Sequence, residues 1–162
     1  PEIGPLSPAD ARLALVEPAE RAGVVFQQKA IDAIYAQTQG YPYFLQEWGY
    51  QAWNLAPTPK INAAVVARAT AASLGRLDEG FFRVRFDRLT PREKDYMRAM
   101  ASLGAGPHRS GEIADKLKAP VRSVAPVRSS LISKGMIYSP AHGDTGFTVP
   151  LFDAYLRRMM PS

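Results

Sequence analysis

The sequence contains no cysteine among its 162 residues. This absence excludes disulfide bonds, thiol nucleophiles, zinc–thiolate sites and iron–sulfur clusters. A chain of this size buries roughly 70% of the surface that it exposes when unfolded, so it needs no covalent staple to fold. We therefore expect a globular protein with a cytoplasmic location.

Long apolar runs are also missing. No stretch approaches the roughly 18 residues that would cross a bilayer, and no basic flank followed by an apolar segment opens the chain. The sequence thus predicts neither a membrane span nor a signal peptide, and no membrane partner. Because the chain starts at Pro1 rather than at Met, we expect it to be a piece of a longer polypeptide.

Residue patterns that carry catalysis or bind nucleotides are scarce. The only histidines, His108 and His142, are 34 residues apart and have no clustered carboxylates near them, so neither a metal site nor a Ser–His pair is expected. No Gly-x-x-x-x-Gly-Lys-[Ser/Thr] motif and no strand ending in acids are present. We therefore expect this chain by itself to be no enzyme and to hold no cofactor.

Basic residues are concentrated in the second half of the chain. Residues 1–75 hold 5 Lys/Arg and 6 Asp/Glu, whereas residues 76–162 hold 15 and 9. No acid lies between Asp115 and Asp144, and the cations of that window are Lys116, Lys118, Arg122, Arg128 and Lys134. Such a one-sided field attracts phosphate backbones, although a solvated basic face without a partner gives the same pattern.

The first half of the chain has the apolar spacing of short helices. Ser7-Pro8 is typical of a helix start, and Pro18 is expected to end that helix after Glu17. Gly40 stands where a left-handed residue closes the next helix, and Tyr41-Pro42 opens a third. The predicted helices are 8–17, about 26–39, 42–56 and about 62–77, which together form a small helical bundle over residues 1–75.

The second half begins with three more helical signals. Thr90 and Glu93 form a capping box, Ser110 is placed to cap a two-turn helix, and Ser123 is placed to cap a third helix. Two short strands, 136–139 and 146–149, then make a predicted hairpin, and a last helix follows Pro150. Three helices followed by a hairpin is the order of a winged helix-turn-helix.

The predicted fold class is therefore mainly α: a small helical bundle, then a winged helix-turn-helix with a C-terminal helix. The predicted domains are 1–75 and 88–162, and the aromatic and basic segment 76–87 is their junction. Phe81, Phe82 and Phe86 are expected to be buried between the two domains.

The third helix of the second domain is the candidate site for nucleic acid. Val124, Val127 and Leu131 follow an inward spacing, which leaves a small and serine-rich outward face. That face is poor in the Asn, Gln and paired Arg that read bases, so phosphate contact is favoured over sequence readout. The candidate DNA-binding residues are Arg122, Ser123, Arg128, Ser129, Lys134 and His142.

The segment Gly40-Tyr41-Pro42-Tyr43-Phe44-Leu45-Gln46 resembles the Gly-x-Pro-x-Tyr/Phe-Leu-Gln segment in the helical lid of prokaryotic AAA+ or STAND-type P-loop ATPases. Residues 82–93 and 131–138 are similar to the junction and winged helix that follow the lid in those proteins. The resemblance covers nearly the whole chain. It implies that an upstream P-loop domain, holding ATP and Mg, precedes this chain and is a partner of it.

The resemblance also implies a function. This chain would be the C-terminal regulatory region of an ATP-binding protein whose winged helix binds DNA. In the alternative, the winged helix is a protein-interaction module of the ATPase and does not touch DNA. Many relatives place a sensor 2 arginine just after the Gly-x-Pro, where this sequence has Tyr43, which favours nucleotide-gated switching over hydrolysis assisted by the lid. The oligomeric state is left open.

Overall fold

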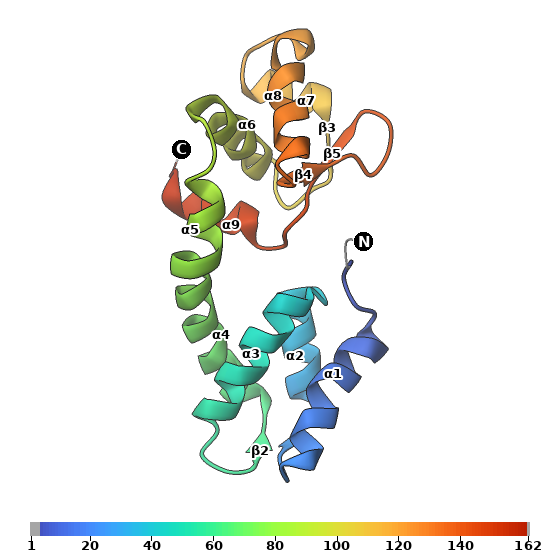
Figure 1. The fold of residues 1–162 in the computed structure, drawn as a ribbon, viewed down its shortest axis with the longest axis vertical. Helices are drawn as coiled ribbons and strands as arrows, with labels where there is room; N and C mark the ends of the chain where they lie inside the picture. Colours follow the sequence, from blue (N-terminus) through green and yellow to red (C-terminus); the bar gives the residue numbers. More distant parts are fainter. Residues whose placement is uncertain (1–3, 162) are drawn as a thin grey trace. The chain divides into compact units, whose positions relative to one another are not determined.

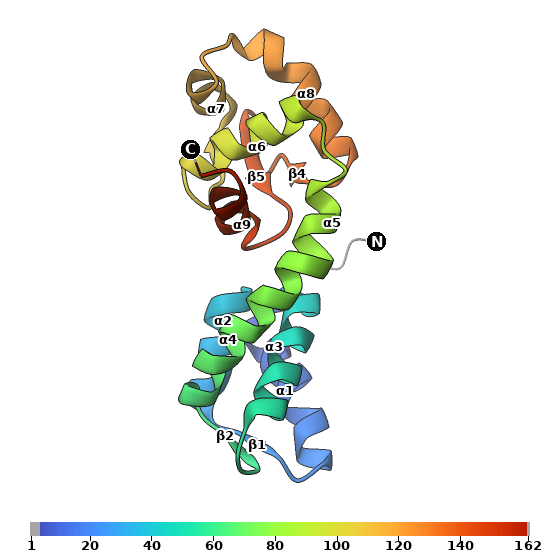
Figure 2. The same ribbon diagram turned by 90° about the vertical axis from the view of Figure 1, so that its left-hand side faces the viewer.

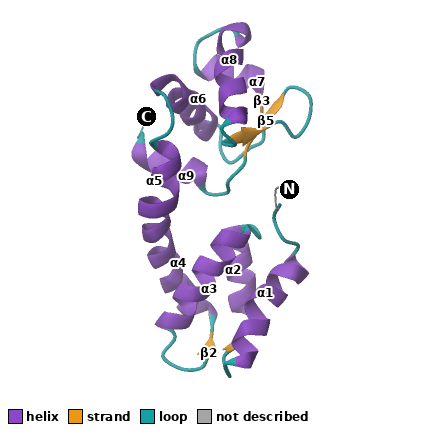
Figure 3. Ribbon diagram, viewed as in Figure 1, coloured by secondary structure: helices purple, strands orange, loops and turns teal. Residues whose placement is uncertain are grey.

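The computed structural model describes residues 4–161, which divide into two compact units after Leu77 (Figure 1). Helices dominate both units, and the strands are short (Figure 3). The predicted mainly α fold class is confirmed. Within the described residues no helix has the length and apolar character needed to cross a bilayer.

The first unit is a bundle of four helices. Its elements are α1 (Pro8–Arg21), β1 (Val25–Phe26), α2 (Gln28–Thr38), α3 (Pro42–Leu55), β2 (Lys60–Ile61) and α4 (Ala63–Leu77). Trp48 of α3 is fully buried, and its indole Nε1 donates a hydrogen bond to Thr70 Oγ1 of α4 at 3.0 Å. β1 and β2 pair in parallel, although two-residue strands leave no periodic trace in the sequence.

The prediction that Pro18 ends the first helix, α1, is wrong. The helix continues to Arg21 with Pro18 inside. Proline removes one backbone hydrogen bond, but Leu15 before it and Ala19 after it are both buried against the bundle, and that burial offsets the lost bond. Gly40 closes the next helix as predicted, with φ +77°; a Cβ there would lie 2.3 Å from the Leu6 carbonyl oxygen.

The second unit combines helices with a three-stranded antiparallel sheet. Figure 2 shows two of its strands, β4 and β5, beside the helices. Its elements are η1 (Asp78–Phe82), α5 (Arg83–Phe86), α6 (Pro91–Ser102), β3 (His108–Arg109), α7 (Ser110–Lys116), α8 (Val121–Ser133), β4 (Ile137–Tyr138), β5 (Asp144–Phe147) and α9 (Phe152–Met159). The capping box is present: Thr90 Oγ1 accepts from the Glu93 amide at 3.2 Å, and the Glu93 carboxylate accepts from the Thr90 amide at 2.8 Å.

The sheet differs from the predicted two-stranded hairpin. β5 lies between β4 and a third strand, β3, with His108 opposite Thr145 and Arg109 opposite Asp144. His108 is therefore in a strand, and its Nε2 lies 3.0 Å from the Gly104 carbonyl oxygen. A strand of two residues shows no alternation that a sequence pattern could reveal.

The segment predicted as a junction is largely helical: residues 76 and 77 end α4 of the first unit, and residues 78–87 belong to the second unit. Phe82 is fully buried, with its ring centroid 5.6 Å from that of Phe152 and 5.2 Å from that of Tyr155. Phe81 is also buried, and Phe86 is half-buried against Tyr155 at 5.8 Å. These aromatic contacts connect the start of the second unit to its last helix, α9.

Candidate nucleic-acid interface

Helices α7 and α8, the turn between them and the β4–β5 turn occupy the positions that the sequence predicts for a helix-turn-helix and its wing (Figure 1). Val124, Val127 and Leu131 are buried, which confirms the predicted inward face of α8. The same spacing turns Arg122 and Ser129 to the opposite, exposed side. The outward side of α8 is thus small and carries few charges.

Two predicted caps have other roles. The N-cap of α8 is Pro120, and the exposed Ser123 uses its hydroxyl to donate to the Pro120 carbonyl at 2.8 Å. Ser110 is the first residue of α7 rather than its cap, and its Oγ lies 3.2 Å from Thr145 Oγ1. The Ser123 hydroxyl thus holds the first turn of α8, and the Ser110 hydroxyl contacts β5.

Two of the candidate contacts lie where a nucleic acid could reach them. Arg122 is exposed in the first turn of α8, and it forms no hydrogen bond or ion pair with any other residue that the structure describes. His142 is exposed in the turn between β4 and β5, at the tip of the wing. Their roles in DNA binding remain predictions.

Arg128 is not the exposed side chain that the sequence predicts. It is half-buried; its Nε donates to Thr145 Oγ1 at 2.9 Å and its Nη2 donates to the Asp144 carbonyl at 3.0 Å. The periodicity of α8 placed Arg128 at the edge of the outward face. The wing folds back along that edge, and acceptors in β5 bind the Nε and Nη2 donors of Arg128.

Lys134 is likewise part of the fold. Its Nζ lies 2.6 Å from Glu93 Oε1 and donates to the Arg88 carbonyl at 3.0 Å, while Ser130 Oγ donates to Glu93 Oε2 at 2.9 Å. The Glu93 side chain is only 3% exposed, so Lys134 neutralises a buried carboxylate. An ammonium group engaged in this way is a poor candidate for phosphate contact.

Burial raises the pKa of Glu93, but the hydrogen bonds from Lys134, the Thr90 amide and Ser130 outweigh it and lower the pKa from 4.5 to about 2. The unfolded chain binds a proton at this site between these values, and the folded chain does not. The stability that Glu93 confers is therefore complete above about pH 4.5 and is lost as the pH falls towards 2.

We expect the free energy of unfolding of the wild type to fall by about 2–3 kcal/mol more than that of Glu93→Gln between pH 5 and pH 2, since one pKa unit is about 1.4 kcal/mol. Urea unfolding at several pH values measures this difference. The exposed Glu20→Gln is the matched control for the loss of one carboxylate. Parallel curves for the wild type and Glu93→Gln would contradict a low pKa at Glu93.

Three exposed cations near the helix-turn-helix were not among the predicted contacts. Lys116 ends α7, Lys118 lies in the turn with φ +53°, and Arg109 lies in β3 opposite Asp144. Lys116 and Lys118 belong to the acid-free window of the sequence, so the charge pattern did mark them. No sequence pattern indicated Arg109, because its place beside the wing depends on the pairing of β3 with β5.

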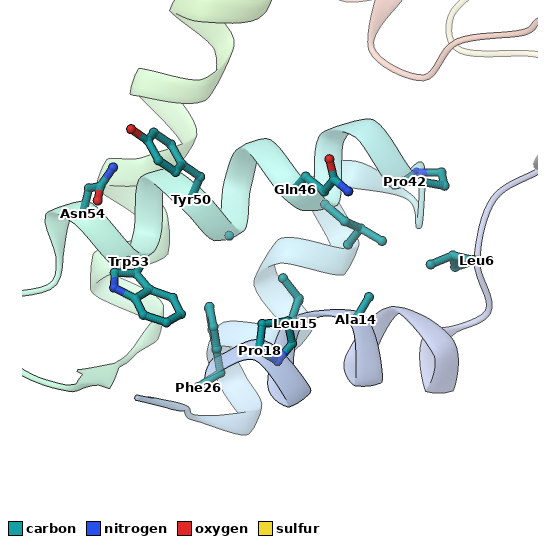
Figure 4. Close-up of a pocket in the computed structure, with 12 residues that line it drawn as sticks. Leu6, Ala14, Leu15, Pro18, Phe26, Pro42, Gln46, Tyr50, Trp53 and Asn54 are labelled. Carbon is teal, nitrogen blue, oxygen red and sulfur yellow. The ribbon is translucent and has the colours of Figure 1, made fainter. Parts of the chain in front are cut away.

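The first unit contains an open cavity of about 530 Å³ between α1 and α3 (Figure 4). Leu15 and Pro18 of α1 face Trp53 of α3 across it, and Gln46 and Asn54 bring amide groups to its wall. No charged side chain is among the described residues that line this cavity. Tyr43 is 52% exposed on α3.

No cluster of three or more His, Asp or Glu residues suited to a metal ion occurs in residues 4–161.

Residues 79–156 match a protein family described as Domain of unknown function (DUF8462), which covers just under half of the chain. No curated protein matches the chain.

Among solved structures, the chain is similar to RuvB from Thermotoga maritima, a Holliday junction branch migration motor. The identity is 13%, the match covers 90% of this chain and 47% of that one, and the TM-score is 0.42. Two point mutants of the same protein give 15% identity with a TM-score of 0.45 and 14% identity with 0.43. The chain spans about half the length of these structures, and likeness at this level assigns no function.

Proposed function

We propose that this chain is the C-terminal regulatory region of an AAA+ or STAND-type P-loop ATPase, and that its second unit binds duplex DNA as a winged helix. The observation that carries the DNA-binding proposal is the exposed Arg122 at the start of α8, with Lys116, Lys118 and Arg109 exposed on neighbouring elements. The ATPase context rests on the resemblance of residues 40–46 to a helical lid.

The surface chemistry supports backbone recognition more than base recognition. Arg122 is the one Arg, Lys, Asn or Gln on α8 that is exposed, because Arg128 is held by the wing. Bidentate readout of a base in the major groove takes an Arg, Lys, Asn or Gln at its edge. Contacts to phosphates need only accessible cations and amides, and they carry little sequence information.

Fluorescence anisotropy with a duplex of mixed sequence, titrated at several salt concentrations, tests this function. We expect Arg122→Ala to weaken binding to all duplexes alike and to lower the slope of log K against log salt by about one. Arg21→Ala is the matched control: Arg21 is exposed in the first unit, and its loss should leave the slope unchanged. Absence of wild-type binding at low salt would reject DNA binding.

One observation favours the alternative of a protein-interaction module. Val121 and Ile132 are 49% and 37% exposed, and they lie three turns apart on one side of α8. Exposed aliphatic side chains at such a spacing fit a protein partner such as the upstream ATPase domain. Under this alternative, Ile132→Ser weakens binding to that domain, whereas Arg122→Ala does not.

ATP and Mg are proposed to bind the P-loop domain and not this chain, because the amide cradle and its lysine are absent from the sequence. Calorimetric titration of the chain with MgATP should therefore give no binding heat. A micromolar complex would contradict this assignment and would direct attention to the bundle.

A further inference from the structure

A buried hydroxyl, that of Thr145, links the wing to two helices. Thr145 is fully buried in β5; its Oγ1 accepts a hydrogen bond from Arg128 Nε of α8 at 2.9 Å and lies 3.2 Å from Ser110 Oγ of α7. Arg128 Nη2 also donates to the Asp144 carbonyl at 3.0 Å, and the Ser110 amide donates to the Gly143 carbonyl at 2.8 Å. These bonds all converge on the residues that follow the wing tip.

We propose that Arg128 is a positioning residue, not a phosphate ligand, and that with Thr145 it sets the wing at the angle to α8 that DNA binding requires. The inference rests on the proposed DNA-binding function. Under this proposal, His142 of the wing contacts the DNA. That contact depends on Arg128, a side chain that does not touch the DNA.

The sheet offers few bonds to hold the wing. β3 and β4 each have two residues, and β5 has four, so only a few ladder bonds connect them. The Arg128 guanidinium adds two bonds in a fixed plane, from two of its nitrogens to two neighbouring residues of β5. The planar guanidinium group of Arg128 thereby holds the wing against α8.

The environment of Arg128 supports positioning over ligand binding. Nε and Nη2 are both engaged by acceptors of the protein, and the side chain is half-buried. The accepting hydroxyl of Thr145 is inaccessible to solvent, so a displaced Arg128 would leave it without this donor. Moving the Arg128 side chain away from the wing to reach a phosphate would therefore cost free energy.

Salt dependence separates the two roles. A phosphate ligand contributes about one unit to the slope of log K against log salt, whereas a positioning residue changes affinity and leaves the slope alone. The full chain is titrated with the same mixed-sequence duplex as Arg128→Gln, as Thr145→Val and as the double variant. Arg122→Ala serves as the reference for a true phosphate contact.

We expect Arg128→Gln and Thr145→Val each to weaken binding roughly 5–10-fold with an unchanged slope, and the double variant to lose little more than either, because the two side chains act as one unit. Thr145→Ser keeps the hydroxyl and should bind within about twofold of the wild type. Amide exchange of residues 139–143 should accelerate in Arg128→Gln while the exchange of α6 stays unchanged.

Two results would overturn the positioning role. A slope reduced by about one in Arg128→Gln, with Thr145→Val binding like the wild type, would make Arg128 a phosphate ligand. The link between Arg128 and Thr145 would also be removed if their single losses of DNA affinity add up in the double variant and amide exchange in the wing does not change. If the wild type binds no duplex at low salt, the proposed function fails and this inference falls with it, an outcome distinct from either of the others.

Discussion

Lys134→Met is expected to lower the free energy of unfolding by about 3–5 kcal/mol, because it leaves the buried Glu93 carboxylate without its counter-charge. Lys134 Nζ lies 2.6 Å from that carboxylate, whose side chain is 3% exposed. Methionine is similar in length to lysine, so packing changes little. Urea or thermal unfolding at neutral pH measures the loss.

Two further variants isolate the charge effect. Lys116→Met removes an exposed lysine at the end of α7 and should change stability by no more than about 0.5 kcal/mol. Adding Glu93→Gln to Lys134→Met should recover part of the loss, since a neutral amide costs less to bury than an unpaired carboxylate. A loss below about 1 kcal/mol for Lys134→Met would contradict the role of this ion pair.

Phe82→Ala is expected to destabilise the second unit by about 3–5 kcal/mol, the usual cost of removing a buried aromatic ring. Phe82 is fully buried, and its ring lies within 5.6 Å of the Phe81, Phe152 and Tyr155 ring centroids. Loss of the ring opens a cavity between η1 and α9. Val84→Ala, at a side chain that is 46% exposed, should cost less than about 1 kcal/mol and is the matched control.

Limited proteolysis gives an independent reading of the same packing. Arg83, Arg85 and Arg88 are trypsin sites that follow Phe82 directly. The wild type should resist cleavage there, since η1 and α5 are helical and their aromatic side chains are packed. Phe82→Ala should be cut faster at these sites than Val84→Ala. Rapid cleavage of the native wild type would show that this segment is an open linker.

Local signals in the sequence predicted the helices of both units well. The Thr90–Glu93 capping box, Gly40 at a helix end and the inward spacing of Val124, Val127 and Leu131 all appear in the structure. Each depends on residues within one or two turns of each other, and so their physics is contained in a short stretch of chain. The mainly α fold class follows from such signals.

The candidate site was predicted less completely. Arg122 is exposed, as the helical period of α8 requires, and His142 lies in the wing turn. Arg128 and Lys134 have the same local sequence character as Arg122, yet their acceptors are Thr145 and Glu93, 17 and 41 residues away along the chain. A period gives the direction of a side chain but not the partner that it meets.

The sequence alone therefore determined most of the helices, their order and the basic character of the second half, because propensity, capping and composition are local or additive. Tertiary structure decided which cations remain available, because a lysine beside a buried carboxylate or an arginine against a strand is defined by distant residues. It also decided that α1 runs through Pro18 and that β3 joins the sheet. In both cases packing against other elements outweighed a local preference or supplied a pairing that no local pattern contains.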